Sequence, residues 1–260
     1  MRKAIIGGTG IYNLNGIEID KIQEVEITTE YGAVSLEIGN YGGTEIVFLP
    51  RHGKGHGVPP HKINYRANMM ALKELEVDEI FATCAVGSLN EGFPVGSIVI
   101  LKDFLDFTQG RESTFHEGYD GAVAHVVMDK PYCPDLSKSL SNLAREKGVQ
   151  IAGEAVYVCT QGPRFETAAE IKMFGKLGGD VVGMTNVPEC VLAKELGMCY
   201  SAVGIVSNWC TGFKDEKISM HDIDAAMSKN KSVVTELFVE ILIDSKRNKE
   251  CKCKNSLILL

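Results

Sequence analysis

Five short stretches of this 260-residue chain combine glycines with side chains that bind anions or polar rings. The first, residues 7–10 (Gly-Gly-Thr-Gly), follows an apolar run. A glycine-rich turn after a strand lets backbone N–H groups approach an anion. No Gly-Lys-Ser/Thr follows, which excludes a P-loop, and Asn13 stands where the dinucleotide fingerprint needs its third glycine. This stretch alone therefore predicts either an anion-binding turn or a plain tight turn.

Arg51 and His52 begin the second stretch, residues 51–56. The planar guanidinium fork of arginine suits a tetrahedral oxyanion, and the histidine can add a donor. A zinc site built from His52, His56 and His61 is a weaker alternative, because the loop offers no carboxylate or thiolate ligand and its glycines hold imidazoles poorly. A solvated basic loop is the other alternative.

The third and fourth stretches each link a strand-like run to a helical pattern. In residues 161–167, Phe165 can stack on a flat base and Glu166 can accept hydrogen bonds from a ring N–H and an amino group. Alternatively, Phe165 belongs to the core and Glu166 is an acid favoured at a helix N-terminus. In residues 183–189, Thr185 can offer its hydroxyl to phosphate or simply cap the helix that follows.

The fifth stretch, residues 206–212, ends a long apolar run that is typical of a buried strand. Ligands of open α/β sheets bind beyond the carboxyl ends of the strands. Asn208 carries both a donor and an acceptor, so it can bind the polar edge of a purine.

Apolar, β-branched runs alternate with helical patterns along the chain, which predicts an α/β fold with a central mixed sheet flanked by helices. We expect one domain over residues 1–247 and a tail over residues 248–260 that contains Cys-x-Cys. The strands are expected at residues 3–7, 34–38, 45–49, 79–85, 97–101, 154–159, 181–182 and 199–206. The helices are expected at residues 60–76, 134–147, 188–196, after a capping box at 167–170, and from a second capping box at 219–222 to about 246.

Composition narrows the class of protein. The formal net charge is −7, which argues against sequence-independent binding of nucleic acid. No apolar run approaches the roughly 18 residues of a membrane span. The apolar stretch after the basic N-terminus stops at residues 7–8 and is too short for the core of a signal peptide. We therefore expect a cytoplasmic protein with no membrane partner.

The eight cysteines are scattered, and most lie in apolar runs, where a free buried thiol is expected. Cys251 and Cys253 are the exception. Such a pair can form a strained disulfide or bind a soft metal. Because no second cysteine pair lies nearby in the sequence, we expect no four-ligand zinc site.

In this order, the five stretches resemble the trimeric purine nucleoside phosphorylases and the methylthioadenosine or methylthioinosine phosphorylases. The resemblance covers residues 7 to about 222, and the combination of Gly-Pro-Arg-Phe-Glu-Thr with Gly-Met-Thr-Asn-Val-Pro-Glu is its most specific part. It implies a phosphorylase/hydrolase-like fold and a homotrimer or dimer of trimers. It implies that phosphate is held by Thr9, Arg51, His52, the backbone of Cys84 and Ala85, and Thr185. It implies substrate contacts from Phe165, Glu166, Met184, Ser207, Asn208, Cys210, His56, His221 and, from a neighbouring subunit, His125.

The implied reaction splits purine nucleosides with inorganic phosphate, with Asn208, Glu166 and His52 as catalytic residues and with no cofactor or metal. Methylthioadenosine phosphorylases resemble this chain but place Asp at positions 208 and 210 and lack an acid at position 166. Asn208 with Glu166 therefore indicates a preference for 6-oxopurines. Residues 57–71 and 207–220 resemble the methylthio branch, so the 5′ substituent stays open. The alternatives are methylthioadenosine phosphorolysis, a non-catalytic nucleoside-binding protein, a nucleosidase that uses water, and a dinucleotide-dependent oxidoreductase.

Overall fold

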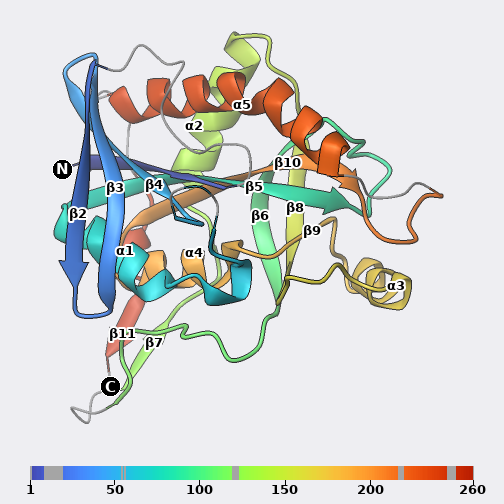
Figure 1. The fold of residues 1–260 in the computed structure, drawn as a ribbon, viewed down its shortest axis with the longest axis horizontal. Helices are drawn as coiled ribbons and strands as arrows, with labels where there is room; N and C mark the ends of the chain where they lie inside the picture. The colour runs from blue at the N-terminus through green and yellow to red at the C-terminus, as the bar shows by residue number, and fades with distance from the viewer. Residues whose placement is uncertain are drawn as a thin grey trace.

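The computed structural model describes residues 2–8, 20–53, 55, 57–118, 123–215, 220–244 and 250–259 (Figure 1). In chain order the elements are β1 (Arg2–Gly7), β2 (Asp20–Thr29), β3 (Gly32–Tyr41), β4 (Thr44–Pro50), a 3₁₀ turn (Pro60–Lys62), α1 (Tyr65–Glu74), β5 (Val77–Ser88), β6 (Ile98–Phe107), β7 (Ala124–Val126), α2 (Pro134–Glu146), β8 (Ile151–Thr160), α3 (Ala168–Lys176), β9 (Val181–Gly183), α4 (Asn186–Glu195), β10 (Cys199–Trp209), α5 (Met220–Ile243), a second 3₁₀ turn (Cys253–Asn255) and β11 (Leu257–Leu259).

Within these ranges, nine strands form one mixed sheet in the order β10-β6-β8-β9-β5-β1-β4-β3-β2. An additional pairing of β10 with β5 joins the first strand of this order to the fifth, so β10, β6, β8, β9 and β5 close into a barrel. The predicted mixed sheet is confirmed, since β2, β3 and β4 pair antiparallel and β4, β1, β5 and β10 pair parallel. The closure was not predicted.

The four parallel strands bring distant loops to one edge of the sheet. In the registers of β1 with β4 and β5, Gly7 lies opposite Pro50 and Ile6 opposite Ala82. In the pairing of β5 with β10, Cys84 lies opposite Gly204. Since parallel strands all end on the same side, the residues that follow β1, β4 and β10 meet there.

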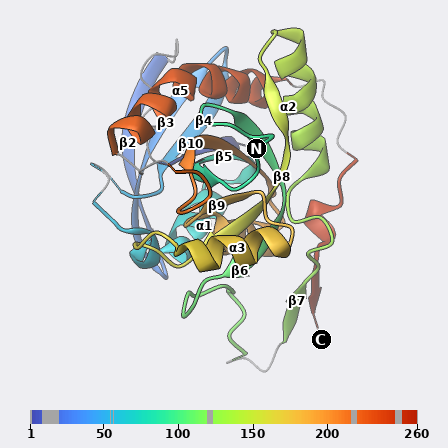
Figure 2. The same ribbon diagram turned by 90° about the vertical axis from the view of Figure 1, so that its right-hand side faces the viewer.

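Helices cover both faces of the sheet (Figures 1 and 2). The long helix α5 and helix α2 pack together on one face, where Phe238 of α5 stacks on Phe81 of β5 with ring centroids 4.5 Å apart. Helices α1 and α4 pack on the opposite face, and α3 lies on the side of the molecule away from β2 and β3 (Figure 1). None of the helices in the described part of the chain is long and apolar enough to span a membrane.

Local signals in the sequence explain where two helices begin. The predicted capping box is confirmed at α3, where the Thr167 hydroxyl accepts from the Glu170 N–H and the Glu170 carboxylate accepts from the Thr167 N–H. The single helix predicted over residues 60–76 is wrong, because a 3₁₀ turn precedes α1 and Asn64 caps α1 by accepting from the Ala67 N–H. Ser219, the first residue of the second predicted capping box, lies outside the described residues.

The C-terminal segment lies against the body of the molecule. β11 pairs with β7, with Ile258 opposite His125, and together they project on the side away from α5 (Figures 1 and 2). The predicted boundary between residues 247 and 248 falls within 245–249, outside the described residues, and stays a prediction.

Candidate active site

A cavity of about 360 Å³ lies at the edge where β1, β4, β5 and β10 end. Its wall contains most of the residues that the sequence singled out, although they come from distant parts of the chain. They are Arg51, His52, Cys84, Ala85, Phe165, Glu166, Met184, Thr185, Ser207, Asn208 and Cys210. Residues from all five stretches therefore line one cavity, with Gly8 from the first stretch among them.

Four predicted residues are not placed in this wall. Thr9 and His56 lie outside the described residues, as does the side chain of His221, whose backbone belongs to the first turn of α5. Ile223, two residues further along α5, does line the cavity. His125 lies in β7, is exposed and does not line this cavity.

Arg51 is fully buried and is held from both sides of its guanidinium group. Its Nε and Nη2 donate to the two carboxylate oxygens of Glu189 at 2.5 and 2.7 Å, and its Nη1 donates to the Thr83 carbonyl at 2.8 Å. Burial alone lowers the pKa of Arg51, but the Glu189 carboxylate more than offsets this and raises the pKa, so the group stays charged. Tyr200 donates to the same carboxylate at 2.6 Å. The fork therefore faces Glu189, and only the remaining N–H groups can serve a ligand.

Gly8 brings the backbone of the first loop close to this arginine. A Cβ atom at Gly8 would lie 2.7 Å from Arg51 Nη1 and 2.8 Å from the Thr83 carbonyl oxygen, so any other residue would displace one of them. The same position lies 3.7 Å from the Cα of Cys84. The thiol of Cys84 donates to the Val203 carbonyl within the sheet, and burial raises its pKa to about 12. The thiol stays neutral and is engaged within the sheet, which supports a role for the backbone at Cys84.

Thr185 stands before α4, the helix that also carries Glu189. Its side chain makes no capping hydrogen bond, so the interpretation of Thr185 as a simple helix cap is wrong. The backbone N–H of Thr185 instead donates to the hydroxyl of Tyr157 at 3.1 Å. Gly183 permits this approach, because a Cβ there would lie 2.5 Å from the same hydroxyl. A threonine hydroxyl at a helix N-terminus is well placed for an anion.

His52 is buried, and its Nδ1 lies 2.8 Å from the carbonyl oxygen of Val58. A carbonyl only accepts, so Nδ1 carries a proton in this arrangement. The bond fixes the ring against residues 57–60, which also line the cavity. We call Gly8, Arg51, His52 and Thr185 the Arg51 end of the cavity.

The residues of the 161–167 loop face the other part of the cavity. Phe165 lines the wall but is 47% exposed, so the interpretation of Phe165 as a core residue is wrong. Glu166 is buried, and one of its oxygens accepts from the Thr160 hydroxyl at 2.6 Å. Burial, with a further contribution from the Glu166 carboxylate, raises the pKa of the Cys210 thiol. Cys210 is therefore a neutral neighbour of Glu166.

A β-bulge directs Asn208 into the cavity. Val206 and Asn208 lie opposite the adjacent residues Val86 and Gly87, so Ser207 is the extra residue of β10. One extra residue in a strand reverses which face the next side chain takes. The Asn208 Nδ2 donates to the Trp209 carbonyl at 2.8 Å, and its Oδ1 accepts from the Ser207 hydroxyl at 2.8 Å. The carbonyl fixes the orientation of the amide, since a flipped amide would set two acceptors against each other, and the second N–H of Nδ2 is left for a ligand.

Gly87 gives this amide its space, because a Cβ at Gly87 would lie 3.1 Å from Asn208 Nδ2. Phe165, Glu166 and Asn208 form what we call the Asn208 end of the cavity. Cys84 and Gly87, three residues apart on β5, mark the two ends, which corresponds to about 10 Å along a strand. That separation leaves room for a sugar ring between an anion and a flat heterocycle.

Arg111 ties the loops of both ends together, and sequence reasoning missed it. Its Nη2 donates to the carbonyls of Gln161 and Met184 at 2.8 and 2.9 Å, and its Nη1 donates to the Val187 carbonyl at 2.6 Å. Nothing in the local sequence marks it, because its partners, which are backbone carbonyls together with the Gln161 and Tyr65 side chains, lie more than 45 residues away. Glu189 was visible in the fourth stretch, but its buried pairing with Arg51 was not predicted.

Among the described residues, one group of side chains could hold a metal ion: Cys133, Cys199, Cys251 and Cys253. None of the four lines the cavity. His52 and His61 do not form such a group in the described part of the chain, and His56 lies outside it.

Comparison with known proteins agrees with this geometry. Residues 2–243 match the family model described as "Phosphorylase superfamily". The chain is 47% identical to a probable 6-oxopurine nucleoside phosphorylase of Dictyoglomus turgidum, over 99% of this chain and 97% of that protein. It is 44% identical to a probable S-methyl-5′-thioinosine phosphorylase of Methanothermobacter thermautotrophicus, over 97% and 88%. The crystal structure of a methylthioadenosine phosphorylase from an antarctic soil metagenomic library covers 98% of this chain and 90% of its own, with a TM-score of 0.87 and 32% identity.

Proposed function

Because this chain belongs to the phosphorylase superfamily, we propose that it splits purine nucleosides with inorganic phosphate. The products are the free base and ribose 1-phosphate or its 5-methylthio analogue. The preferred bases are 6-oxopurines, as the names of its relatives at 44–47% identity suggest.

One observation carries the proposal: a buried cation and an oriented carboxamide line the same cavity, beside Cys84 and Gly87, which are about 10 Å apart along β5. Phosphate is assigned to the Arg51 end, where the unpaired N–H groups of Arg51, the Thr185 hydroxyl and the backbone at Gly8 are available. The purine is assigned to the Asn208 end, where Phe165 supplies an exposed ring face. The sugar then lies between them, against Met184.

In the proposed mechanism, cleavage of the glycosidic bond builds negative charge on the purine and positive charge on the sugar. The second N–H of Asn208 donates to N7 of the leaving base as charge develops there. Phosphate stabilises the cationic sugar and attacks its anomeric carbon, since both are held in place before reaction. No covalent intermediate with the protein, redox cofactor or metal is needed.

We assign to Glu166 the discrimination between 6-oxopurines and adenine. One of its oxygens is engaged by Thr160, which leaves the other for the purine. Hypoxanthine and guanine carry an N1–H that a carboxylate accepts, whereas adenine presents a lone pair there. A buried polar group left without a partner costs about 1–3 kcal/mol, so adenine is disfavoured.

The 5′ substituent is assigned to the part of the cavity beside Ile223 of α5, and an apolar wall there favours methylthioinosine as an accepted substrate. The 44% identical relative named for that substrate supports this assignment. His125 lies on the projecting β7–β11 pair and does not line the cavity of its own subunit. We assign it to the site of a neighbouring subunit in a homotrimer or dimer of trimers.

The test is a panel of inosine, guanosine, methylthioinosine, adenosine and methylthioadenosine, each incubated with and without phosphate. We expect base release only with phosphate, together with a sugar 1-phosphate, and faster release from the three 6-oxopurine nucleosides. Equal release without phosphate would indicate a nucleosidase, and binding without release would indicate a non-catalytic protein. Faster release from the adenine nucleosides would overturn the preference but leave phosphorolysis intact.

A further inference from the structure

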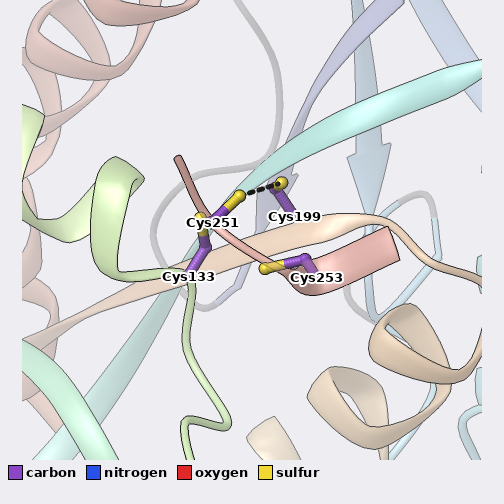
Figure 3. A group of neighbouring side chains, drawn as sticks. All are labelled: Cys133, Cys199, Cys251 and Cys253. Carbon is purple, nitrogen blue, oxygen red and sulfur yellow. Dashed lines mark hydrogen bonds between the residues drawn. The ribbon is translucent and has the colours of Figure 1, made fainter. Parts of the chain in front are cut away.

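Four cysteine sulfurs lie close together, and none of these cysteines lines the cavity. Cys133 is the residue before α2, Cys199 begins β10, and Cys251 and Cys253 belong to the C-terminal segment. Their Sγ atoms all lie within 4.8 Å of one another, and those of Cys199 and Cys251 are 3.4 Å apart (Figure 3). The expectation of no four-ligand zinc site rested on the lack of a second cysteine pair nearby in the sequence. The fold nevertheless brings Cys133 and Cys199 beside Cys251 and Cys253.

Hydrogen bonds that do not involve sulfur position Cys133 and Cys251. The Cys133 N–H donates to the carbonyl of Tyr200 at 2.7 Å, which fixes Cys133 beside the start of β10. One carboxylate oxygen of Asp135 accepts from the N–H groups of Glu250 and Cys251 at 2.6 and 2.8 Å. The C-terminal segment is thereby anchored to the first turn of α2, and the site is largely organised before any ligand binds.

The spacing and chemistry fit one tetrahedral ion. A Zn–S bond of about 2.3 Å gives sulfur–sulfur edges of about 3.8 Å in a tetrahedral Zn(Cys)₄ site. The distance of 3.4 Å between Cys199 and Cys251 is close to that edge, and no sulfur–sulfur separation exceeds 4.8 Å, so side-chain shifts of about 1 Å or less would complete the coordination. All four are free cysteines, and thiolates are the ligands that zinc prefers in closed structural sites. We propose that Cys133, Cys199, Cys251 and Cys253 bind a single structural Zn²⁺.

Binding would release the protons of the four thiols and leave a complex of charge −2. Cys133 lies at the N-terminal, positive end of the α2 dipole, which favours a thiolate there. Lys252 and Lys254 alternate with the two C-terminal ligands and add positive charge. Three of the four cysteines are buried and Cys251 is half-buried, so the ion is enclosed but reachable from Cys251. Joining the same sulfurs as two disulfides would instead need an oxidant to remove four electrons.

The proposed ion would clamp the C-terminal segment to the body of the protein. β11 follows Cys253 by a short 3₁₀ turn and pairs with β7, placing Ile258 opposite His125. Losing the ion should therefore loosen β11 and lower the thermal stability of the chain, since metal binding free energy is folding free energy.

The experiment measures zinc and thiols on the full chain isolated anaerobically without metal-affinity steps. We expect about one zinc per chain and eight thiols after denaturation in chelator. The double variant Cys251→Ser/Cys253→Ser should lose the zinc, whereas Cys190→Ala, a buried cysteine outside the cluster, should keep it. A chelator should lower the Tm of the parent but not of the double variant.

A measurement on the parent chain covers the case in which the double variant does not fold. The chelated, reduced protein titrated with Co²⁺ should develop the visible absorption of a tetrahedral thiolate complex, with its end point at one ion per chain. Two outcomes overturn the proposal: four thiols missing with a mass lower by four hydrogens, which means two disulfides, or eight thiols with neither Zn²⁺ nor Co²⁺ bound.

Discussion

The Arg51 end and the Asn208 end of the cavity differ in what holds their polar side chains. At the Arg51 end, a fully buried ion pair joins Arg51 to Glu189, and Tyr200 and Thr83 complete it from the sheet. At the Asn208 end, Asn208 and Glu166 are oriented by neutral partners close in sequence: Ser207, Trp209 and Thr160. Changes at the first end should therefore affect folding and phosphate together, and changes at the second should affect the base while leaving the fold intact.

Glu189→Gln is expected to have the largest effect. Removing one partner of a buried ion pair leaves an uncompensated charge and costs about 3–5 kcal/mol of stability. Chemical denaturation should show this loss, and the phosphate concentration for half-maximal rate should rise. Glu195→Gln is the matched control, because Glu195 is a buried acid of the same helix whose partners are the Thr114 hydroxyl and the Phe115 N–H. Equal stability of the two variants would show that the buried ion pair does not hold the Arg51 end as argued.

Asn208→Ala comes next and should act on catalysis alone. Losing a donor to developing charge costs about 3 kcal/mol of transition-state stabilisation, or roughly 100-fold in kcat. Half-saturation by phosphate and the unfolding free energy should change little. Asn208→Asp keeps the shape and removes the donor, so it should also slow inosine cleavage. Turnover of inosine by Asn208→Ala at the parental rate would contradict the assignment.

Glu166→Gln should change the choice of base by a smaller amount. A neutral amide can donate to N1 of adenine, so the ratio of kcat/KM for inosine over adenosine should fall about tenfold, or about 1.4 kcal/mol. The ratio is measured by competition between the two nucleosides. Glu170→Gln, an acid of α3 outside the cavity wall, should leave it unchanged. An unchanged ratio in both variants would assign base choice to other residues.

The smallest effect concerns the helix that follows Glu166. The pKa of Glu170 is lowered to about 2, mainly by the hydrogen bond from the Arg164 side chain and then by the hydrogen bond from the Thr167 N–H. A carboxyl group with a lowered folded-state pKa stabilises the fold above its unfolded pKa, and this stability is lost as pH falls from 4.5 toward 2. The pair is solvent-exposed, so we expect less than about 1 kcal/mol.

The measurement is the difference in unfolding free energy between the parent and Glu170→Gln across that range. The difference should be present at neutral pH and should shrink as the pH falls below 4.5. A difference that grows with acid would show that the sign is wrong.

The difference between local and long-range partners also explains what the sequence could predict. The loops that build both ends were recognisable, because glycines, capping residues and polar side chains follow apolar runs that fold as β1, β4, β8, β9 and β10. What the sequence did not indicate are the long-range partners. The pairing of β10 with β5 joins strands more than 100 residues apart, and Arg111 bonds to backbone carbonyls that any residue would supply.

Three further features had only weak local signals. β2 was missed, because its charged, alternating sequence on an edge strand resembles an exposed segment. The bulge at Ser207 depends on the register with β5, which a single strand does not reveal. The cysteine cluster was missed because spacing along the chain was used to judge nearness in space.

The most direct test of the proposed placement, with the sugar between the two ends, is a crystal structure with phosphate and a carbocyclic 6-oxopurine nucleoside analogue. Such an analogue keeps N7 unprotonated but lacks the ring oxygen that a cationic sugar needs. We expect phosphate oxygens within about 2.7–3.2 Å of Thr185 Oγ1 and of an Arg51 nitrogen, and the purine five-membered ring within the same distance of Asn208 Nδ2. Phosphate bound outside this cavity, or a purine seated at the Arg51 end, would contradict the central claim.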